Sequence, residues 1–178
     1  GLIMYCSVTL FYLYGMEIRK ASPDDLPVIN EIYNQAVRQR FCTAHLQQVG
    51  MKEQEQWFAA HDPNIYPVFV AVSDGLVTAW ASLGPYRKDR QALSHVAEVS
   101  YYVADGQREK GVASKLLQHA IDLAPSFGFS VLLAILLNKN VASIGLLEKF
   151  GFREWGRMPE IARIDNQLAD HLYYGLKL

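Results

Sequence analysis

Apolar residues recur at helical spacing in four segments of the chain, and each segment is predicted to be a helix. The first begins at Ser22-Pro23-Asp24-Asp25, where a serine cap, a proline and an acidic residue mark a helix start. Its apolar face comprises Leu26, Ile29, Ile32, Tyr33, Ala36 and Val37. The others are Lys52 to Ala60, a segment after Gly111 with Leu116, Leu117, Ala120, Ile121 and Ala124 on its inward face, and Ala142 to Phe150.

Short apolar or alternating runs between these helices predict strands. Val68 to Val72 and Leu76 to Leu83 flank Asp74-Gly75, a dipeptide typical of a two-residue hairpin turn, so these strands are expected to be antiparallel. The remaining runs are Glu17 to Lys20, His95 to Val103, Val131 to Leu137, Phe152 and His171 to Leu178. The strand, helix and strand between His95 and Leu137 form a crossover. The pattern therefore predicts a mixed α/β domain.

The first fifteen residues, GLIMYCSVTLFYLYG, are mainly apolar, and ordinary mixed composition begins at Met16. The run is too short to span a bilayer as a helix and has no basic segment before it, which argues against a transmembrane helix and a signal peptide. We therefore expect residues 1–15 to be an N-terminal apolar extension and residues 16–178 to be the functional domain.

Composition narrows the class of protein further. The chain has 178 residues, 51% of them hydrophobic and 20% charged, which suits one globular domain. Its formal net charge is −1 and its basic residues are scattered, so we expect it to bind neither nucleic acid nor a membrane. The two cysteines, Cys6 and Cys42, lack metal-ligand spacing, and the five histidines show no metal-ligand pattern. We expect a cytoplasmic protein without a metal.

Residues 108–121, REKGVASKLLQHAI, place a glycine and small residues at the start of a predicted helix. A helix start carries unpaired N–H groups and the positive end of the helix dipole, so Gly111 and Ala113 would let a phosphate group approach the backbone. A glycine that merely turns the chain into a helix explains the pattern equally well. A P-loop is disfavoured, because Val112 and Ala113 stand where it needs lysine and serine or threonine, and the three-glycine dinucleotide fingerprint is absent.

Several motifs in a fixed order resemble the GNAT superfamily of N-acetyltransferases. The segment from Arg108 to Ala113 is similar to that family's Q/R-x-x-G-x-G/A cofactor loop. The other motifs are GPY at Gly84 to Tyr86, EVSYYV at Glu98 to Val103, NKNVAS at Asn138 to Ser143 and EKFGF at Glu148 to Phe152. Together they resemble the phosphinothricin and methionine sulfoximine acetyltransferase branch over nearly all of residues 16–178. The resemblance implies a GNAT fold, a mostly antiparallel mixed sheet flanked by helices, with a splayed parallel strand pair.

The resemblance also implies that acetyl-CoA is the co-substrate. Backbone groups of the strand before the loop would bind the pantetheine arm, and the loop would wrap the pyrophosphate. Asn140 and Ser143 would position the thioester, although a loop residue followed by a helix cap explains both without a ligand. The residues assigned to the cofactor are Tyr101, Tyr102, Val103, Arg108, Glu109, Lys110, Gly111, Val112, Ala113, Ser114, Asn140 and Ser143.

Glu98 is the candidate catalytic base. Acyl transfer to an amine needs a neutral nitrogen, so a base must take a proton from the acceptor directly or through water. By strand alternation Glu98 shares a face with Val96, Ser100 and Tyr102, and glutamate is depleted in strands. A solvated strand face is the alternative explanation, and the match to the family's E-x-S-x-Y-V segment favours catalysis.

Residues for the acceptor are less well marked. Tyr86 ends the GPY motif, and Arg87 and Arg90 follow it; an arginine here would pair with the carboxylate of an amino-acid-like acceptor, although a solvated loop is an equal alternative. Asp170 stands at the family's aspartate position, but Gln167-Leu168 departs from the usual basic residue and tryptophan, which leaves phosphinothricin itself unsupported. Phe41-Cys42-Thr43 occupies a segment that lines the acceptor pocket in relatives.

We expect an enzyme that transfers acetyl directly from acetyl-CoA to the primary amine of a small amino-acid-like molecule, without a covalent intermediate. A catalytically silent acyl-CoA-binding regulatory module is the competing hypothesis, and a homodimer is expected from the resemblance. Leu147 stands where the family often has a tyrosine or histidine that protonates the departing thiolate. Either this role falls to water or another hydroxyl such as Tyr102 or Tyr173, or Leu147 simply packs its helix against the sheet.

Overall fold

The strands form one mixed sheet in the computed structural model, which describes residues 15–108 and 110–178. Within these residues the sheet has seven strands in the order β1-β2-β3-β4-β5-β7-β6, antiparallel except for the parallel neighbours β4 and β5. The strands are β1 (Glu17–Lys20), β2 (Val68–Ser73), β3 (Leu76–Pro85), β4 (Val96–Val103), β5 (Val131–Leu137), β6 (Arg153–Ile164) and β7 (Gln167–Lys177). This arrangement confirms the predicted mixed α/β fold with one parallel strand pair.

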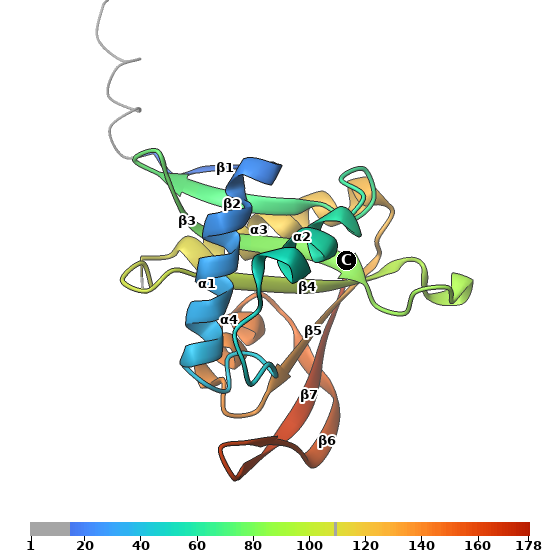
Figure 1. The fold of residues 1–178 in the computed structure, drawn as a ribbon. Coiled ribbons are helices and arrows are strands. Elements are labelled where there is room, and N and C mark those ends of the chain that lie inside the picture. The colour runs from blue at the N-terminus through green and yellow to red at the C-terminus, as the bar shows by residue number, and fades with distance from the viewer. Residues whose placement is uncertain (1–14, 109) are drawn as a thin grey trace, which may run out of the picture.

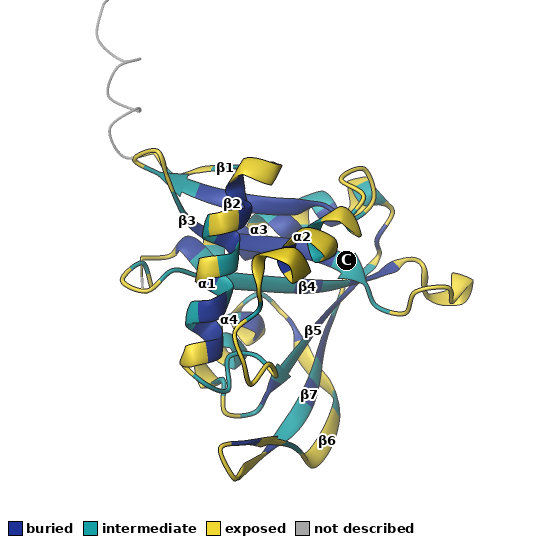
Figure 2. Ribbon diagram, in the orientation of Figure 1, coloured by how far each residue is buried: buried dark blue, intermediate teal, exposed yellow. Residues whose placement is uncertain are grey.

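Helices cover both faces of the sheet. Figure 1 shows α1 (Leu26–Arg38) and α2 (Met51–Ala59) on one face, with α3 (Val112–Leu123) and α4 (Val141–Lys149) behind it. The apolar side of α1 packs with Val70 and Trp80 of the sheet. On the other face Leu117 of α3 and Leu147 of α4 join the core that contains Leu132. In Figure 2 the side of α1 away from the sheet is exposed, as its predicted amphipathic pattern requires.

The parallel strands β4 and β5 pair over only part of their length. Val96, Ala97 and Glu98 pair with Val131, Leu132 and Leu133, and the pairing ends there. Beyond this point β4 continues beside β3, while β5 pairs with β7 along its whole length. The β5-β7-β6 part of the sheet therefore turns away from the rest, as Figure 1 shows, and the C-terminal half of β4 has no strand partner on that side.

The last two strands are longer than the sequence predicted. The prediction placed strands only at Phe152 and at His171 to Leu178, whereas β6 and β7 form a long hairpin. Its turn, Asp165-Asn166, has φ values of 47° and 62°, the left-handed geometry of a two-residue hairpin. β6 was missed because it is an edge strand with mostly exposed side chains, so it has no apolar alternation, and because it contains Pro159.

Asp25 ties the start of α1 to the sheet. Its carboxylate accepts two hydrogen bonds from the guanidinium of Arg19, at 2.7 and 2.9 Å, and one from the backbone N–H of Ser22 at 2.8 Å. The side chain of Asp25 is buried, and the hydrogen bonds from Arg19, with that from Ser22, hold the pKa of Asp25 below its usual range.

We expect Asp25→Asn to lower the free energy of unfolding at neutral pH by about 1–2 kcal/mol, because it removes a charge-assisted pair whose arginine is partly exposed. Since the folded-state pKa of Asp25 is lowered, its stabilisation is complete above the ordinary carboxyl pKa and is lost as the pH falls toward the folded value. Urea denaturation at pH 7 and at pH 3 measures both effects. Equal stability of the two proteins at pH 7 would contradict this account.

Residues 1–14, which make up nearly all of the predicted apolar extension, lie outside the described residues. The assignment of a domain to residues 16–178 therefore stays a prediction. Within the described part of the chain, no helix has the length and apolarity needed to cross a bilayer.

Deleting residues 1–15 is expected to leave a folded domain, because the described core clusters are built from Met16 onward. The melting temperature of the shortened protein should stay within a few degrees of that of the full chain. An insoluble product, or a loss of many degrees in thermal denaturation, would mean that the extension belongs to the core or to a contact between subunits.

Candidate active site

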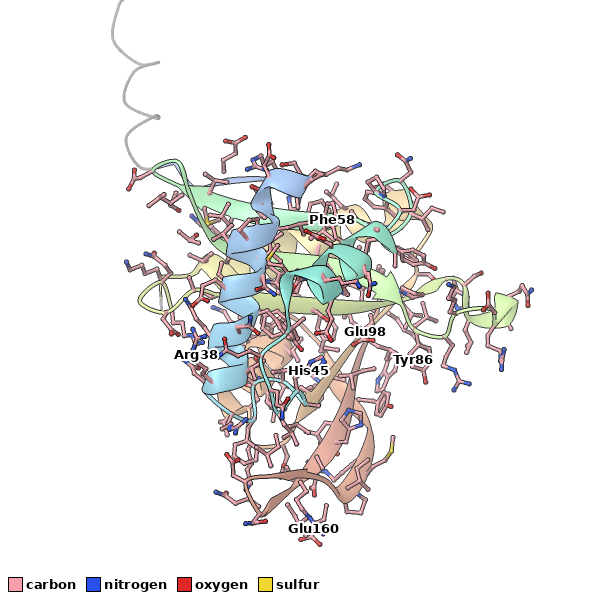
Figure 3. All side chains as sticks on the ribbon, viewed as in Figure 1. Arg38, His45, Phe58, Tyr86, Glu98 and Glu160 are labelled. Atoms are coloured by element: carbon pink, nitrogen blue, oxygen red, sulfur yellow. The ribbon has the colours of Figure 1, made fainter. Side chains whose placement is uncertain are left out.

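Glu98 lies where the two parallel strands part. It is the last β4 residue that pairs with β5, and on the other side it pairs with Gly84 of β3. Because side chains alternate along a strand, Ser100 and Tyr102 share its face of β4, and their β3 partners Ser82 and Trp80 continue the same face. Figure 3 shows Glu98 on the side of the sheet that α2 covers, with His45 on the same side.

This face opens into a cavity of about 700 Å³, which we call the α1–α2 cavity. Its walls come from α1, the loop after it, α2, β3, β4, β5 and the start of β7. The described lining residues are Tyr33, Cys42, Thr43, Ala44, His45, Gln47, Gln48, Val49, Glu53, Gln54, Trp57, Trp80, Ser82, Glu98, Ser100, Tyr102, Ile135, Leu136, Leu137 and His171. Burial in this cavity raises the pKa of Glu98.

A second cavity, of about 420 Å³, lies between the end of β4 and the starts of α3 and α4, and we call it the α3–α4 cavity. Its described lining residues are Ala36, Cys42, Tyr101, Tyr102, Val103, Gln107, Arg108, Gly111, Val112, Ala113, Ser114, Asn140, Ala142, Ser143 and Leu146. Tyr102 and Cys42 line both cavities. The opening between β4 and β5 therefore places two cavities next to each other, with Tyr102 at their junction.

The start of α3 is open to a ligand. Gly111 caps the helix with φ of 75°, a left-handed conformation that glycine adopts without strain, and a Cβ built there would meet no atom within 4 Å. The neighbouring Arg108 contacts Asp105 at 3.4 Å and donates a hydrogen bond to the side chain of Gln39, which in turn donates to Asp105 at 2.9 Å. These contacts hold the loop against the C-terminal end of α1.

Two polar features of the α3–α4 cavity indicate whether it can bind a ligand. The hydroxyl of Tyr101 is buried and has no hydrogen-bond partner among the described residues, and burial raises its pKa to about 12, so it stays protonated at neutral pH. A bound molecule with an acceptor atom would satisfy it. Asn140 accepts a hydrogen bond from the backbone N–H of Ser143 at 3.3 Å. The helix-capping role that the sequence left open is thus present, and both residues also line the cavity.

The structure brings most of the predicted cofactor residues together around the α3–α4 cavity. Lys110 is exposed and is not among its lining residues, and Glu109 lies outside the described residues. Glu98 lines the neighbouring α1–α2 cavity, and its role as a base stays a prediction.

The three predicted acceptor residues are not brought into either cavity. Arg87 is exposed on the loop after β3, and Tyr86 is half-buried near its start. Asp170 accepts hydrogen bonds from Arg157 and from the backbone N–H of Glu160, and these hold the pKa of Asp170 below its usual range. Figure 3 places Glu160 at the far end of the β6–β7 hairpin, away from Glu98. In this structure Asp170 stabilises a hairpin irregularity, and its role toward a substrate stays a prediction.

Leu147 is fully buried and packs in the core between α4 and the sheet. It does not line the α3–α4 cavity, which receives Leu146 instead. The packing explanation is therefore the one that the structure supports.

Sequence reasoning missed most of the α1–α2 cavity wall. Tyr33 was assigned only to the apolar face of its helix, and Trp57, Trp80 and His171 were placed in predicted helices or strands without a role in a site. Trp80 lies on the Glu98 face of the sheet because it pairs with Tyr102 of β4, and this β3–β4 register was not predicted from the sequence. Trp57 and His171 reach the cavity through tertiary packing, which no local pattern encodes.

Within the described residues, no group of three or more His, Cys, Asp or Glu side chains is arranged to hold a metal ion.

Comparison with known proteins identifies the family. Residues 29–152 match the model of the Acetyltransferase (GNAT) family. YwnH of Bacillus subtilis (strain 168), named provisionally as a phosphinothricin acetyltransferase, is 37% identical, and the match covers 92% of this chain and 99% of that protein. An L-methionine sulfoximine/L-methionine sulfone acetyltransferase of Pseudomonas aeruginosa is 36% identical, with 90% and 94% covered.

A solved structure shares the fold. The GNAT superfamily phosphinothricin acetyltransferase (Pat) from Sinorhizobium meliloti, crystallised in complex with AcCoA, superposes with a TM-score of 0.86 at 26% identity, covering 92% of this chain and 88% of that one. The family match, the relatives along nearly the whole chain and the shared fold agree. The chain belongs to the GNAT family of acetyltransferases, in its phosphinothricin and methionine sulfoximine acetyltransferase-like branch.

Proposed function

We propose that the protein transfers the acetyl group of acetyl-CoA to the primary amine of a small amino-acid-like molecule. The observation that carries this proposal is the pair of adjacent cavities, one beside the open start of α3 and the other containing a buried carboxylate. The relatives are named as acetyltransferases of methionine sulfoximine, methionine sulfone or phosphinothricin, and these names support an amino-acid-like acceptor.

The residues around the α3–α4 cavity suit the proposed co-substrate. The first-turn N–H groups of α3, with Arg108 beside them, favour the pyrophosphate, and the bare Gly111 leaves space for its approach. The edge of β4 that faces β5 is unpaired after Glu98, so its backbone groups are free to bind the amides of the pantetheine arm. The Tyr101 hydroxyl and Ser143 add polar side chains beside it.

Bound acetyl-CoA supplies an activated acetyl thioester, and the remaining steps fall to side chains of this chain. Glu98 accepts a proton from the ammonium group of the acceptor, because its raised pKa makes it a better base than an exposed carboxylate. Burial also raises the pKa of Tyr102 far above its usual range, so this hydroxyl keeps its proton. Because Tyr102 lines both cavities, we assign to its hydroxyl the role of proton donor to the departing thiolate.

A thiol-release screen tests the proposal. The protein is incubated with acetyl-CoA and a panel of amino acids, amino-acid analogues and polyamines, and free CoA thiol is measured. We expect release well above the acceptor-free rate with at least one amino-acid-like primary amine, and none with the same compound blocked by N-acetylation. Binding of acetyl-CoA in calorimetry without release for any amine would instead support a silent acyl-CoA-binding module.

The expected homodimer and the cytoplasmic location stay predictions.

A further inference from the structure

His61, in the turn that follows α2, has one ring nitrogen engaged and the other free. Its Nδ1 lies 2.8 Å from the backbone carbonyl oxygen of Trp57, and the two rings pack with centroids 4.4 Å apart. A carbonyl oxygen only accepts hydrogen bonds, so in the neutral ring Nδ1 carries the proton and Nε2 keeps its lone pair. Nε2 makes no hydrogen bond within the described part of the chain.

The free Nε2 lies over the residue that pairs with Glu98. A Cβ built on Gly84 would lie 3.5 Å from Nε2 of His61. Gly84 of β3 pairs with Glu98 of β4, and the side-chain positions of paired residues share one face of the sheet, with Cβ atoms about 4.5–5.5 Å apart. His61 is therefore on the Glu98 face, and Gly84 has no side chain to stand between them. The two side chains make no direct hydrogen bond, so a contact between them runs through water.

Burial shifts the pKa values of these two groups toward each other. It raises the pKa of Glu98, and it lowers the pKa of His61 against the opposing effect of the hydrogen bond to Trp57. An ordinary carboxyl group and an ordinary imidazole differ by about two pKa units, so both shifts narrow that difference. A proton passes most readily between groups of similar pKa.

Other charged side chains beside this turn are exposed and engaged elsewhere. The carboxylate of Asp62 accepts a hydrogen bond from the backbone N–H of Asn64 at 2.9 Å. The ammonium group of Lys20 donates to the backbone carbonyl of Pro63 at 3.1 Å. Among the described residues, Glu98 is the ionisable group that the β3–β4 pairing brings to the Nε2 side of the ring.

We propose that His61 is a positioning residue for Glu98, whose Nε2 takes the proton from the protonated carboxyl group through a bridging water and releases it to solvent. The inference rests on the proposed acetyl-transfer function and adds the path by which the base is regenerated. The acceptor ammonium first gives its proton to the Glu98 carboxylate. The carboxyl group then gives a proton to the water as that water gives one to Nε2, which leaves a carboxylate and an imidazolium. Because His61 is only half-buried, the imidazolium loses its proton to bulk water and the ring becomes neutral again.

His61→Asn separates the roles of the two ring nitrogens. The asparagine amide N–H stands near the position of Nδ1 and can keep the bond to Trp57, but the variant has nothing at the position of Nε2. We expect kcat at saturating acceptor to fall by about tenfold while the affinity for acetyl-CoA stays unchanged. Imidazole added to the buffer should restore part of the lost rate, because a diffusible base replaces the relay. An unchanged kcat, or a loss that imidazole does not reduce, overturns the proposal.

His119→Asn is the matched control. His119 of α3 is also half-buried, and burial lowers its pKa, but it lines neither cavity. Its variant should keep the wild-type kcat and show no response to imidazole. Equal losses in the two asparagine variants would contradict the proposal.

Gly84→Ala tests the same path from the side of the sheet. The added methyl group would meet Nε2 at an ordinary contact distance of 3.5 Å, so we expect the fold to tolerate it. It would occupy space between Nε2 and Glu98 and lower kcat by about threefold or more. Combined with His61→Asn, the alanine should cause no further loss, because the path is already broken. Additive losses in the double variant would contradict a shared path.

Histidine NMR gives a readout that needs no turnover. Long-range 1H–15N spectra should show His61 as the Nδ1–H tautomer when its ring is neutral. Its titration midpoint should fall by about half a pH unit or more in Glu98→Gln, because the glutamine removes a negative charge that favours the imidazolium. Acetyl transfer with an unshifted midpoint would overturn the relay and leave the proposed function standing. A shifted midpoint without acetyl transfer to any amine would uphold the coupling of His61 to Glu98 and overturn the proposed function.

Discussion

Replacing Glu98 by glutamine is expected to lower kcat by about 100-fold or more while acetyl-CoA binding stays unchanged. The amide keeps the shape of the side chain but cannot take the proton that the acceptor ammonium must lose. Glu98 lies in the α1–α2 cavity and is not among the residues that line the α3–α4 cavity, so kcat should fall while the affinity for acetyl-CoA stays the same. Steady-state kinetics at saturating acceptor and calorimetry with acetyl-CoA measure them.

The raised pKa of Glu98 also predicts how the rate depends on pH. Because burial raises the pKa of Glu98, the wild-type rate should fall as the pH drops through a value above that of an ordinary carboxyl group. The variant should lack this acidic limb and keep only the titration of the acceptor amine. Matching rates for the two proteins across the pH range would remove Glu98 from the role of base.

The second large effect is expected from Gly111→Val, which should weaken acetyl-CoA binding by about 10- to 100-fold. A branched side chain would fill the open space at the start of α3, where the phosphate groups are proposed to approach the backbone. It would also strain a residue whose φ is 75°, and a left-handed conformation costs about 1–2 kcal/mol for residues with a Cβ.

Gly128→Val separates the two causes. Gly128 has φ of 87° and open space around it, but it follows α3 and lines neither cavity. Both variants should lose similar stability in thermal denaturation, and only Gly111→Val should lose cofactor affinity in calorimetry. Equal affinities for the two variants would show that the glycine only turns the chain into the helix.

The fold was largely predictable because most of its elements carry local signals. A few adjacent residues were enough to predict each of three elements: the helix start at Ser22 to Asp25, the hairpin turn at Asp74-Gly75 and the buried strand β5. The β6–β7 hairpin gave no such signal, since an exposed edge strand is held by the ladder to its neighbour rather than by burial of alternate side chains.

The residues of the site also differ in how far local sequence predicts them. Glu98, Gly111 and Asn140 lie in contiguous motifs, so the sequence predicted both their chemistry and the strand or helix start that carries each of them. In the structure Glu98 lines the α1–α2 cavity, and Gly111 and Asn140 line the α3–α4 cavity. The wall of the α1–α2 cavity is assembled from separate segments. The hydroxyl of Tyr33 in α1, for example, lies 2.7 Å from the hydroxyl of Thr43, and its ring packs edge-on against the ring of Tyr102 in β4. That wall is complete only when those segments are brought together in the folded chain.

Acetyl transfer itself is the central claim, and the product of a labelled reaction tests it most directly. The protein is incubated with trideuteroacetyl-CoA and L-methionine sulfone. Mass spectrometry measures the amount of labelled acetylated acceptor, and a thiol assay measures the amount of free CoA. The account predicts N-trideuteroacetyl methionine sulfone, formed in equal amount with CoA by wild-type protein and almost absent with Glu98→Gln. CoA released without acetylated amine, or acetylated amine formed equally by both proteins, would contradict it.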